Sequence, residues 1–384
     1  MCTTFLKRCS IITVIFLLFA FMPQAQNNFV QKYENSNVYA GIEVGSKGVK
    51  MSMIELDKKA GEDGEFKILN DTAINTDFIS FTQPTYQATL AALNKLYEVA
   101  VNQNKIPVAN VFTAISSGVN IQAQKEDKMN WIDQLINAFK ANNNEPERTV
   151  AIIDVKEEAR LSHLGIVPEG RRYNTFLIDV GSGNTKGGYF PYGNTKNFRL
   201  FQLTWGTKST FNAADKMLGD DKGLENYNSQ LSRVLAGAEN NEIVYAVNAS
   251  GAFPKSDNIA FSGGIAWALA TLISPELNDN AVVGVTYDDV LQFSEKIFKN
   301  PSLYSDFYIV KTLPENSSVD ADKLGRDVKQ VNKVFDQRAL LAGTGLLLKI
   351  MRQFDGVVER KKFYLVKNGA VGWISAYVNQ HVSK

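Results

Sequence analysis

Residues 38–56 read VYAGIEVGSKGVKMSMIEL, and residues 175–190 read TFLIDVGSGNTKGGYF. In both stretches two apolar runs are separated by a short turn rich in glycine and serine, which predicts a β-hairpin. The two copies lie about 136 residues apart by direct count. This weak internal repeat predicts two related halves, each opening with a hairpin whose turn carries backbone N–H groups.

The sequence around the hairpins alternates strand and helix patterns, which predicts an α/β fold. After the first hairpin, apolar spacing predicts helices over residues 86–101, 131–141 and 156–164, and strands over 108–115 and 150–155. After the second hairpin it predicts sheet segments over 243–250 and 258–261, and helices over 265–272, 290–298 and 337–354. Two glycines inside the last helix, Gly343 and Gly345, predict a close helix–helix approach.

Chain length and charge limit the organisation and the partners. The chain has 384 residues, enough for two domains that each bury a core. We place these domains at residues 38–170 and 171–384, because the second hairpin opens the second half. The chain has 41 Lys and Arg residues against 40 Asp and Glu, a formal charge of +1. Nucleic-acid-binding proteins usually carry a basic excess, so this balance argues against a nucleic-acid partner.

Residues 1–26 are typical of a secretory signal peptide. Lys7 and Arg8 precede residues 11–22, an apolar run that is too short to span a bilayer comfortably. A polar leader over residues 27–37 follows, and both cysteines of the chain lie in the signal. We therefore expect an exported protein, periplasmic or in a bacterial cell envelope, without a further membrane span or a disulfide. An uncleaved anchor is the alternative.

Three glycine-bearing turns are candidate sites for an anion. They are Gly45-Ser46-Lys47, Gly181-Ser182-Gly183-Asn184-Thr185 with the following Lys186, and Gly263-Gly264 before the helix predicted over residues 265–272. Without a Cβ, glycine lets backbone N–H groups converge on an anion, and a helix N-terminus adds its own anion site. One such turn alone is more simply an ordinary tight hairpin. Two in repeated halves and a third before a helix favour phosphate binding.

Glu157 and Glu158 lie between the two hairpins at the start of a predicted helix. Neighbouring carboxylates on a helix point in different directions, so position alone does not make them a catalytic pair. One interpretation is a solvated first turn, where the helix dipole favours acids. The other directs one glutamate into a cleft as a general base, with Asp179 nearby to hold a cation. His163 is more simply a packing residue, because the sequence has no metal-ligand spacing.

These motifs resemble those of the exopolyphosphatase/guanosine-pentaphosphate phosphatase family. Its A-x-D-L-G-S-N-S hairpin corresponds to residues 40–48, its E-E-A-R-L-x-x-x-G stretch to residues 157–165, and its D-x-G-G-G-S-T-E motif to residues 179–186. Order and approximate spacing agree over about residues 38–375. The family belongs to the actin–hexokinase superfamily of ATPase-like folds. The resemblance therefore implies two related actin-like (ribonuclease H-like) α/β domains with a cleft between them.

The resemblance also implies roles for single residues. Glu158 corresponds to the family's catalytic glutamate and would activate water for attack on a terminal phosphoryl group. Asp179 and Glu43 would hold Mg²⁺, the expected cofactor. The residues that would contact phosphate are Gly45, Ser46, Lys47, Gly181, Ser182, Gly183, Asn184, Thr185, Lys186, Gly263 and Gly264.

Several positions depart from the family's motifs, among them Ser182 for a glycine and Asn184 for a serine, and two departures concern carboxylates. Glu43 stands where the family has aspartate, and Lys186 stands where it has glutamate. The extra methylene of Glu43 moves its carboxylate by roughly 1.5 Å, and metal sites are sensitive to such shifts. Lys186 replaces a carboxylate with an ammonium, which could contact phosphate as a point charge.

Three functions stay open. The leading expectation is an exported, Mg²⁺-dependent hydrolase that releases terminal phosphate from polyphosphate or a related phosphorylated compound. The alternative, favoured by Glu43 and Lys186, is a catalytically impaired protein that only binds such a compound. The third is an envelope scaffold on an actin-like fold, which no residue supports specifically. A homodimer is compatible with each of them.

Overall fold

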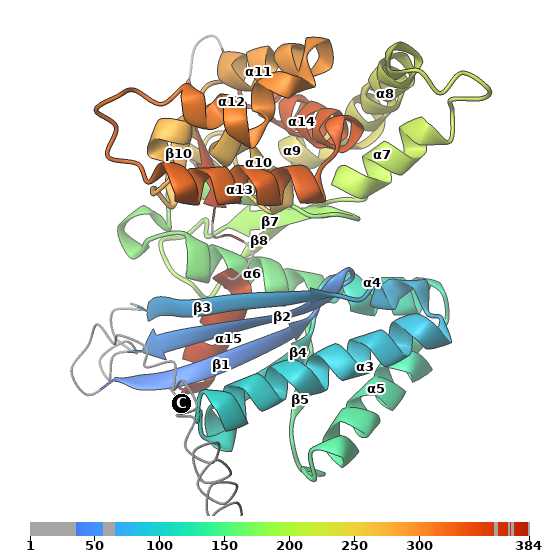
Figure 1. Cartoon of the computed structure of the whole chain (residues 1–384), viewed down its shortest axis with the longest axis vertical. Helices are drawn as coiled ribbons and strands as arrows, with labels where there is room; N and C mark the ends of the chain where they lie inside the picture. The colour runs from blue at the N-terminus through green and yellow to red at the C-terminus, as the bar shows by residue number, and fades with distance from the viewer. Residues whose placement is uncertain (1–35, 57–65, 357–359, 368, 370–371, 383–384) are drawn as a thin grey trace, which may run out of the picture.

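The computed structural model describes residues 36–56, 66–356, 360–367, 369 and 372–382. Within these ranges the chain forms two halves, each built on one mixed β-sheet, and Figure 1 shows them one above the other. The predicted signal peptide (residues 1–26) and most of the predicted leader (residues 27–37) lie outside the described residues. No helix within the described ranges is both long enough and apolar enough to cross a bilayer.

The first sheet has the strand order β3-β2-β1-β4-β5. Its strands are β1 (Asn37–Val44), β2 (Gly48–Leu56), β3 (Phe66–Asn75), β4 (Val111–Ile115) and β5 (Val150–Ile152). β1 pairs antiparallel with β2 and parallel with β4. The predicted first hairpin is therefore confirmed.

The second sheet has the strand order β10-β11-β9-β6-β7-β8. Its strands are β6 (Thr175–Val180), β7 (Thr185–Tyr189), β8 (Arg199–Leu203), β9 (Asn258–Ser262), β10 (Val282–Val285) and β11 (Lys362–Val366). β6 pairs antiparallel with β7 and parallel with β9, which confirms the second hairpin. Apart from β10 at one edge, this sheet repeats the strand order of the first. The internal repeat is therefore a repeat of topology.

Helices cover one face of each sheet. In the first half they are α3 (Gln83–Glu98), α4 (Ser117–Lys125) and α5 (Met129–Asn142). In the second half they are α7 (Thr207–Asp215), α8 (Leu224–Ala238), α9 (Val244–Ser250), α10 (Gly264–Ile273), α11 (Tyr287–Lys299), α12 (Asp306–Lys311), α13 (Ala321–Val334) and α14 (Gln337–Arg352). α11 is capped at its N-terminus: the Thr286 hydroxyl accepts a hydrogen bond from the Asp289 N–H at 3.1 Å.

Two further helices form a layer between the sheets. α6 (Val155–Ile166) packs against β7 of the second sheet, and α15 (Gly372–Val382) packs against β1 and β2 of the first. The two helices also pack against each other. The predicted second domain, residues 171–384, includes α15, whose contacts lie instead with the first sheet. The boundaries of the domains otherwise stay a prediction.

Glycines set the closest contacts between helices. A Cβ at Gly165 of α6 would lie 2.0 Å from the carbonyl oxygen of Gly372 in α15, far inside any normal contact. The predicted close approach of the last long helix is also confirmed. A Cβ at Gly343 would lie 2.8 Å from a side chain of α10, and one at Gly345 would lie 2.5 Å from a side chain of α8.

One predicted sheet segment is wrong. Residues 243–250 form the helix α9 (Val244–Ser250) and its preceding turn. Their β-branched residues favoured a strand. Burial follows a helical period instead, because Ile243 and Val247 are buried and Tyr245 is exposed. Packing of one helical face therefore overrides the strand propensity of the segment.

Replacing Gly165 by alanine tests the contact between α6 and α15. We expect Gly165→Ala to lower the free energy of unfolding by about 3 kcal/mol, because the added methyl must displace the α15 backbone. Gly237→Ala in α8 is the matched control, since a Cβ there meets nothing within 4 Å. That change should leave stability unchanged or raise it by up to about 1 kcal/mol. Urea unfolding measures both, and a Gly165→Ala protein as stable as the wild type would contradict the close approach.

Candidate functional site

Alternation along two equivalent strands directs two acids to the layer between the sheets. In β1, Ile42 and Val44 pack into the core of the first half, so Glu43 points to the opposite face. In β6, Ile178 packs into the core of the second half, so Asp179 points away from that core. Both acids therefore face the layer that α6 and α15 form.

The neighbouring glutamates of α6 have different surroundings. Asp154 caps the helix by accepting a hydrogen bond from the Glu157 N–H at 2.8 Å. The Glu157 carboxylate accepts two hydrogen bonds from the Arg160 guanidinium, at 2.8 and 2.6 Å. Glu158 is only 3% exposed and has partners from both halves of the molecule. The surface interpretation therefore holds for Glu157, and the inward-pointing one holds for Glu158.

Both carboxylate oxygens of Glu158 have a partner. Oε2 accepts a hydrogen bond at 2.6 Å from the N–H of Ser117, the first residue of α4. Oε1 lies 2.6 Å from Nζ of Lys186 in β7. The carboxylate thus satisfies a free amide at the N-terminus of α4, where the helix dipole favours a negative charge. One side chain of α6 therefore joins α4 of the first half to β7 of the second.

Lys186 also approaches Asp179. The two residues are paired across β6 and β7, and Nζ lies 3.9 Å from Oδ2 of the aspartate. Ser262, the last residue of β9, donates a hydrogen bond to Asp179 Oδ1 at 3.1 Å. The Lys186 side chain is 9% exposed. Its ammonium is therefore withdrawn from solvent and lies between Glu158 and Asp179.

The first half repeats this arrangement. Glu43 is paired with Lys50 across β1 and β2, as Asp179 is with Lys186. Glu43 Oε2 accepts a hydrogen bond from Trp373 Nε1 of α15 at 3.1 Å. Sequence reasoning missed Lys50 and Trp373. The offset of about 136 residues between the two hairpins, applied to Lys186, could have identified Lys50.

Burial and the nearby lysines shift the pKa values of these acids in opposite directions. Burial raises the pKa of Glu43 and of Asp179 above their ordinary values, although nearby lysines oppose it. Burial also acts to raise the pKa of Glu158, but the Lys186 ammonium and Ser117 outweigh it, and the pKa is lowered. Burial acts to lower the pKa of Lys186, but Glu158 and Asp179 raise it above its ordinary value. Glu158 and Lys186 are therefore both charged at neutral pH.

The two hairpin turns are closed in the same way. The Gly45 N–H donates to the carbonyl of Gly48 at 2.9 Å, and the Gly181 N–H donates to that of Asn184 at 3.0 Å. These two amides are used within the turns and are not free for an anion. Among the described residues, the turn amides without an acceptor are those of Ser46, Lys47, Ser182, Gly183 and Asn184.

The second turn is packed against the N-terminus of α7. The carbonyls of Gly181 and Ser182 accept hydrogen bonds from the first amides of α7 at 2.8 to 3.2 Å. The Thr185 hydroxyl donates to the carbonyl of Trp205 at 2.7 Å. A Cβ at Gly206 would lie 2.6 Å from three backbone atoms of the turn, so glycine is required there. Gly206 therefore positions the second turn against α7, a role that sequence reasoning missed. Because the turn carbonyls use the first amides of α7, the N-terminus of this helix is not an anion site.

Lysines of opposite halves lie close together. Lys47 in the first turn forms an ion pair with Asp77. Lys208 is the second residue of α7, and the neighbouring Lys47 lowers its pKa. Like charges at short range repel, and an anion between them would remove the penalty. Lys208 therefore joins Lys47 as a candidate contact for phosphate, and sequence reasoning missed it.

The third turn lies against Asp179. Gly263 has a φ of 95°, and a Cβ there would lie 2.3 Å from the Val180 carbonyl oxygen and 2.9 Å from Asp179 Oδ1. Only glycine suits this conformation and this contact. Gly264 then begins α10. The structure thus places Gly263 beside the second hairpin, with Asp179 next to it.

The residues around Glu43 and Asp179 do not suit the expected Mg²⁺. Within the described ranges, no group of three or more His, Cys, Asp or Glu side chains is placed to hold a metal ion. Mg²⁺ needs oxygen ligands in near-octahedral geometry. Here each acid has one oxygen engaged by Trp373, Ser262 or Ser117, and the Lys186 ammonium stands beside two of the three acids. These acids are therefore arranged to pair with an ammonium and with hydrogen-bond donors, and not to ligate Mg²⁺.

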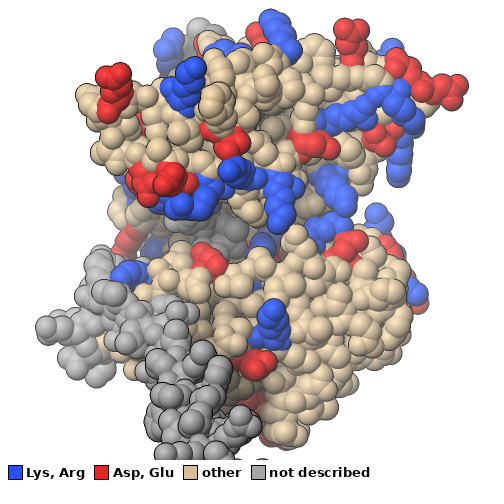
Figure 2. All heavy atoms as spheres, in the orientation of Figure 1, with Lys and Arg blue, Asp and Glu red and all other residues tan. Residues whose placement is uncertain are grey.

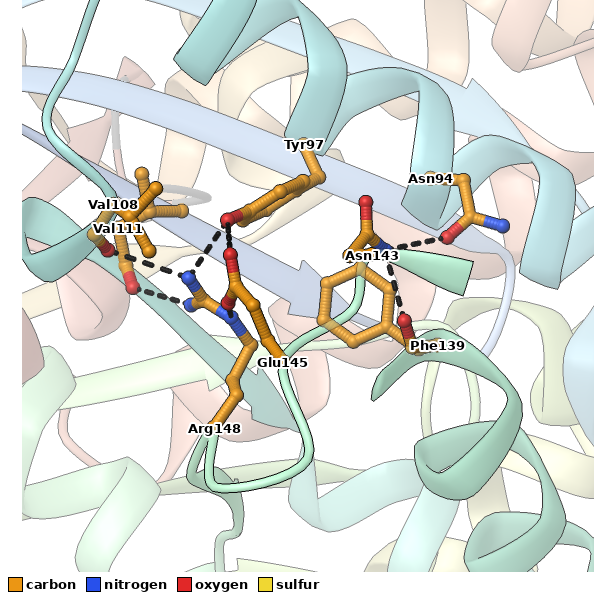
Figure 3. A network of polar contacts seen from close by, with 8 residues as sticks. All are labelled: Asn94, Tyr97, Val108, Val111, Phe139, Asn143, Glu145 and Arg148. Carbon is orange, nitrogen blue, oxygen red and sulfur yellow. Dashed lines mark hydrogen bonds and ion pairs between the residues drawn. The ribbon is translucent and has the colours of Figure 1, made fainter. Parts of the chain in front are cut away.

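An open surface pocket of about 800 Å³ lies away from these residues, along α3 and the end of α5. Figure 3 shows the network beside it, in which Arg148 pairs with Glu145. The Arg148 guanidinium also donates to the Tyr97 hydroxyl at 2.9 Å and to the Val111 carbonyl at 2.8 Å. These contacts tie the loop after α5 to α3 and β4. We assign the network a structural role.

Comparisons with known proteins come from structure. No protein-family model and no curated protein matches the chain. The Ppx/GppA family member of Aquifex aeolicus shares 14% identity at a TM-score of 0.60, over 90% of this chain and 98% of that one. An exopolyphosphatase from Cytophaga hutchinsonii shares 12% identity at a TM-score of 0.57, over 89% and 98%. An exopolyphosphatase-like protein shares 14% identity at a TM-score of 0.56, over 91% and 98%.

These similarities show the fold. The expected two actin-like α/β halves are confirmed, because the likeness to the Ppx/GppA structures extends over nearly the whole chain. The resemblance read from the motifs is therefore confirmed in architecture. A fold shared at this identity does not fix the chemistry of a site.

The ion pair of Lys186 with Glu158 can be measured by a double-mutant cycle. We expect Lys186→Met to lower the free energy of unfolding by about 3 kcal/mol or more, because it leaves buried carboxylates without compensation. Lys186→Met combined with Glu158→Gln should cost less than the sum of the two single changes. Urea unfolding of the wild type, the two single variants and the double variant gives the coupling free energy between the two side chains. Additive effects would contradict a direct buried pair.

His163 predicts a pH dependence of stability. It is fully buried, its Nε2 lies 3.0 Å from the Thr175 carbonyl, and burial lowers its pKa from 6.5 to about 4. Between these values the unfolded chain binds more protons, so His163 stabilises the fold above about pH 6.5 and loses that effect as pH falls towards 4. His163→Gln keeps a donor for Thr175 and removes the titration. Its Tm should fall less than that of the wild type on acidification over this range, and equal falls would contradict the assignment.

Proposed function

We propose that this protein is a phosphoanhydride hydrolase that releases terminal phosphate from polyphosphate or a related phosphorylated compound. The fold that it shares with exopolyphosphatase structures supports this class of reaction. The observation that carries the proposal is Glu158, an ionised and buried carboxylate whose partners adjoin a glycine turn from each half.

The two partners of Glu158 lead to the two hairpin turns. Ser117 precedes Gly118, where a Cβ would lie 2.9 Å from Oγ of Ser46 in the first turn. Lys186 closely follows the second turn in the sequence. A phosphoryl group bound by the free turn amides would therefore lie near Glu158.

In the proposed reaction Glu158 accepts a proton from water while the water oxygen attacks the terminal phosphorus. The P–O bond to the rest of the substrate breaks, its electron pair passes to the leaving phosphate oxygen, and inorganic phosphate is released. The lowered pKa keeps Glu158 ionised at neutral pH and makes it a weaker base. Phosphoryl transfer depends mainly on positioning and charge stabilisation, which the turns and the lysines can supply.

A basic edge along the groove between the halves suits an anionic chain. Figure 2 shows Lys and Arg side chains gathered along the edge of the upper half that faces the lower half. α13 lies along this edge in Figure 1 and carries Lys323, Arg326, Lys329 and Lys333. Lys323 and Lys329 have acidic partners. Because the chain is almost neutral overall, attraction of a polyanion would have to come from a local edge of this kind.

A binding protein without hydrolysis is the second candidate. Both oxygens of Glu158 are engaged, one by Ser117 and one by Lys186. A carboxylate stabilised in this way is less ready to take a proton from water. Such a protein would bind the phosphorylated compound at the turns and release no phosphate.

We also propose that the protein is exported to the periplasm or cell envelope, since residues 1–26 are typical of a signal peptide. Nucleoside triphosphates are expected to be scarce outside the cytoplasm. Export therefore favours polyphosphate or a similar compound over a nucleotide as the substrate. A homodimer stays a prediction.

Phosphate release from polyphosphate tests the hydrolase. We expect Glu158→Gln to reduce the rate by about 100-fold or more, because the amide cannot accept the proton. Glu157→Gln is the matched control: it lies one residue away on the same helix, forms a partly exposed pair with Arg160 and should keep the wild-type rate. Each protein is assayed with Mg²⁺ and with EDTA.

The outcomes separate the candidates. Equal loss in both variants would contradict a specific role for Glu158. Thermal stabilisation by polyphosphate without phosphate release would favour the binding protein. Neither release nor stabilisation would leave the envelope scaffold as the remaining candidate.

A further inference from the structure

We propose that Lys186 is a built-in cation, whose ammonium takes the place in which a divalent metal ion would neutralise Glu158 and Asp179, so that this site works without such a metal. The inference rests on the proposed function for its anionic ligand. Whether the site works without a divalent metal ion can be tested by metal binding, without measuring hydrolysis.

An ammonium and a metal ion cannot share this place. Nζ of Lys186 lies 2.6 Å from Glu158 Oε1 and 3.9 Å from Asp179 Oδ2. A Mg²⁺ ion bound to either oxygen would lie about 2 Å from it, so it would approach the ammonium closely and be repelled. The other oxygens of the two acids already accept hydrogen bonds from Ser117 and Ser262.

The position of Lys186 is fixed by the sheet. Its strand β7 lies between β6 and β8, and Lys186 pairs with Asp179 on one side and Gln202 on the other. Its side chain is 9% exposed, unlike a surface lysine that moves freely in water. The charge is therefore held at one point, as the charge of a bound metal ion would be.

The balance of charge also favours a resident ammonium. Three acids, Glu43, Glu158 and Asp179, share this layer with Lys50 and Lys186. Without Lys186, the half-buried Lys50 would be the one lysine among the described residues of this layer to oppose three carboxylates, which is the situation that a divalent cation relieves. Each lysine faces an acid across its own hairpin, so both halves contain the same cross-strand pair of an acid and a lysine.

The test compares the response of three full-length proteins to MgCl₂ and to polyphosphate, by titration calorimetry and thermal unfolding. For the wild type we expect no heat of Mg²⁺ binding, no Mg²⁺-dependent change in Tm, and equal stabilisation by polyphosphate in Mg²⁺ and in EDTA. Lys186→Glu exchanges the ammonium for a carboxylate, and we expect Mg²⁺ to bind it and to raise its Tm. Lys296→Glu makes the same change of charge at an exposed position of α11, outside the basic edge of α13, and should respond as the wild type does.

Several results would overturn the proposal: Mg²⁺ binding by the wild type, loss of its polyphosphate stabilisation in EDTA, or a folded Lys186→Glu protein that ignores Mg²⁺. If Lys186→Glu does not fold, two measurements on the wild type still test the proposal. They are the Mg²⁺ titration and the comparison of polyphosphate stabilisation in Mg²⁺ and in EDTA. A wild type that releases no phosphate would contradict the hydrolase and leave this inference standing, because the metal titration needs no reaction. A wild type that does not bind polyphosphate would contradict the proposed ligand, and the Mg²⁺ titration alone would then decide.

Discussion

The ammonium of Lys186 compensates carboxylates that the fold buries between its two sheets. Strand alternation directs Glu43 and Asp179 into this layer, and α6 brings Glu158. A buried carboxylate is tolerated when it is paired and hydrogen-bonded, and costs several kcal/mol when it is not. Because Glu158 contacts α4 of the first half and β7 of the second, the same ion pair also joins the halves. The layer between the sheets therefore depends on the charge of Lys186, with Lys50 acting beside Glu43.

The layer is made from distant parts of the chain. α6 comes from the middle of the sequence and α15 from its end, yet their backbones meet where Gly165 approaches Gly372. α15 covers the face of β1 opposite α3 and α5, and its Trp373 reaches Glu43. The last helix thus completes the surroundings of an acid in the first strand. This return of the chain end to the first sheet explains why a single division of the sequence into two domains describes the molecule incompletely.

Local patterns gave a correct prediction of the hairpins, the helix α11 and the helix that carries Glu158, because turn residues and apolar spacing act within a few residues. They failed for residues 243–250, where strand propensity was outweighed by packing of a helical face. They also gave an incomplete description of the turns. The Gly45 and Gly181 amides close their own hairpins, and Gly206 and Lys208 come from a loop and a helix that only the fold brings to the site.

The sequence by itself determined the repeated hairpins, the presence of Glu158 beside Glu157, and the replacement of an expected acid by Lys186. These are properties of single positions and of short-range order. Only the tertiary structure decided that Glu158 is the buried glutamate of the two, and that Lys186 pairs with it rather than standing free to contact phosphate. The physical reason is distance. An ion pair forms between groups a few ångströms apart, and the separation of α6 from β7 is set by the packing of the sheets and helices around them, which no local stretch of sequence encodes.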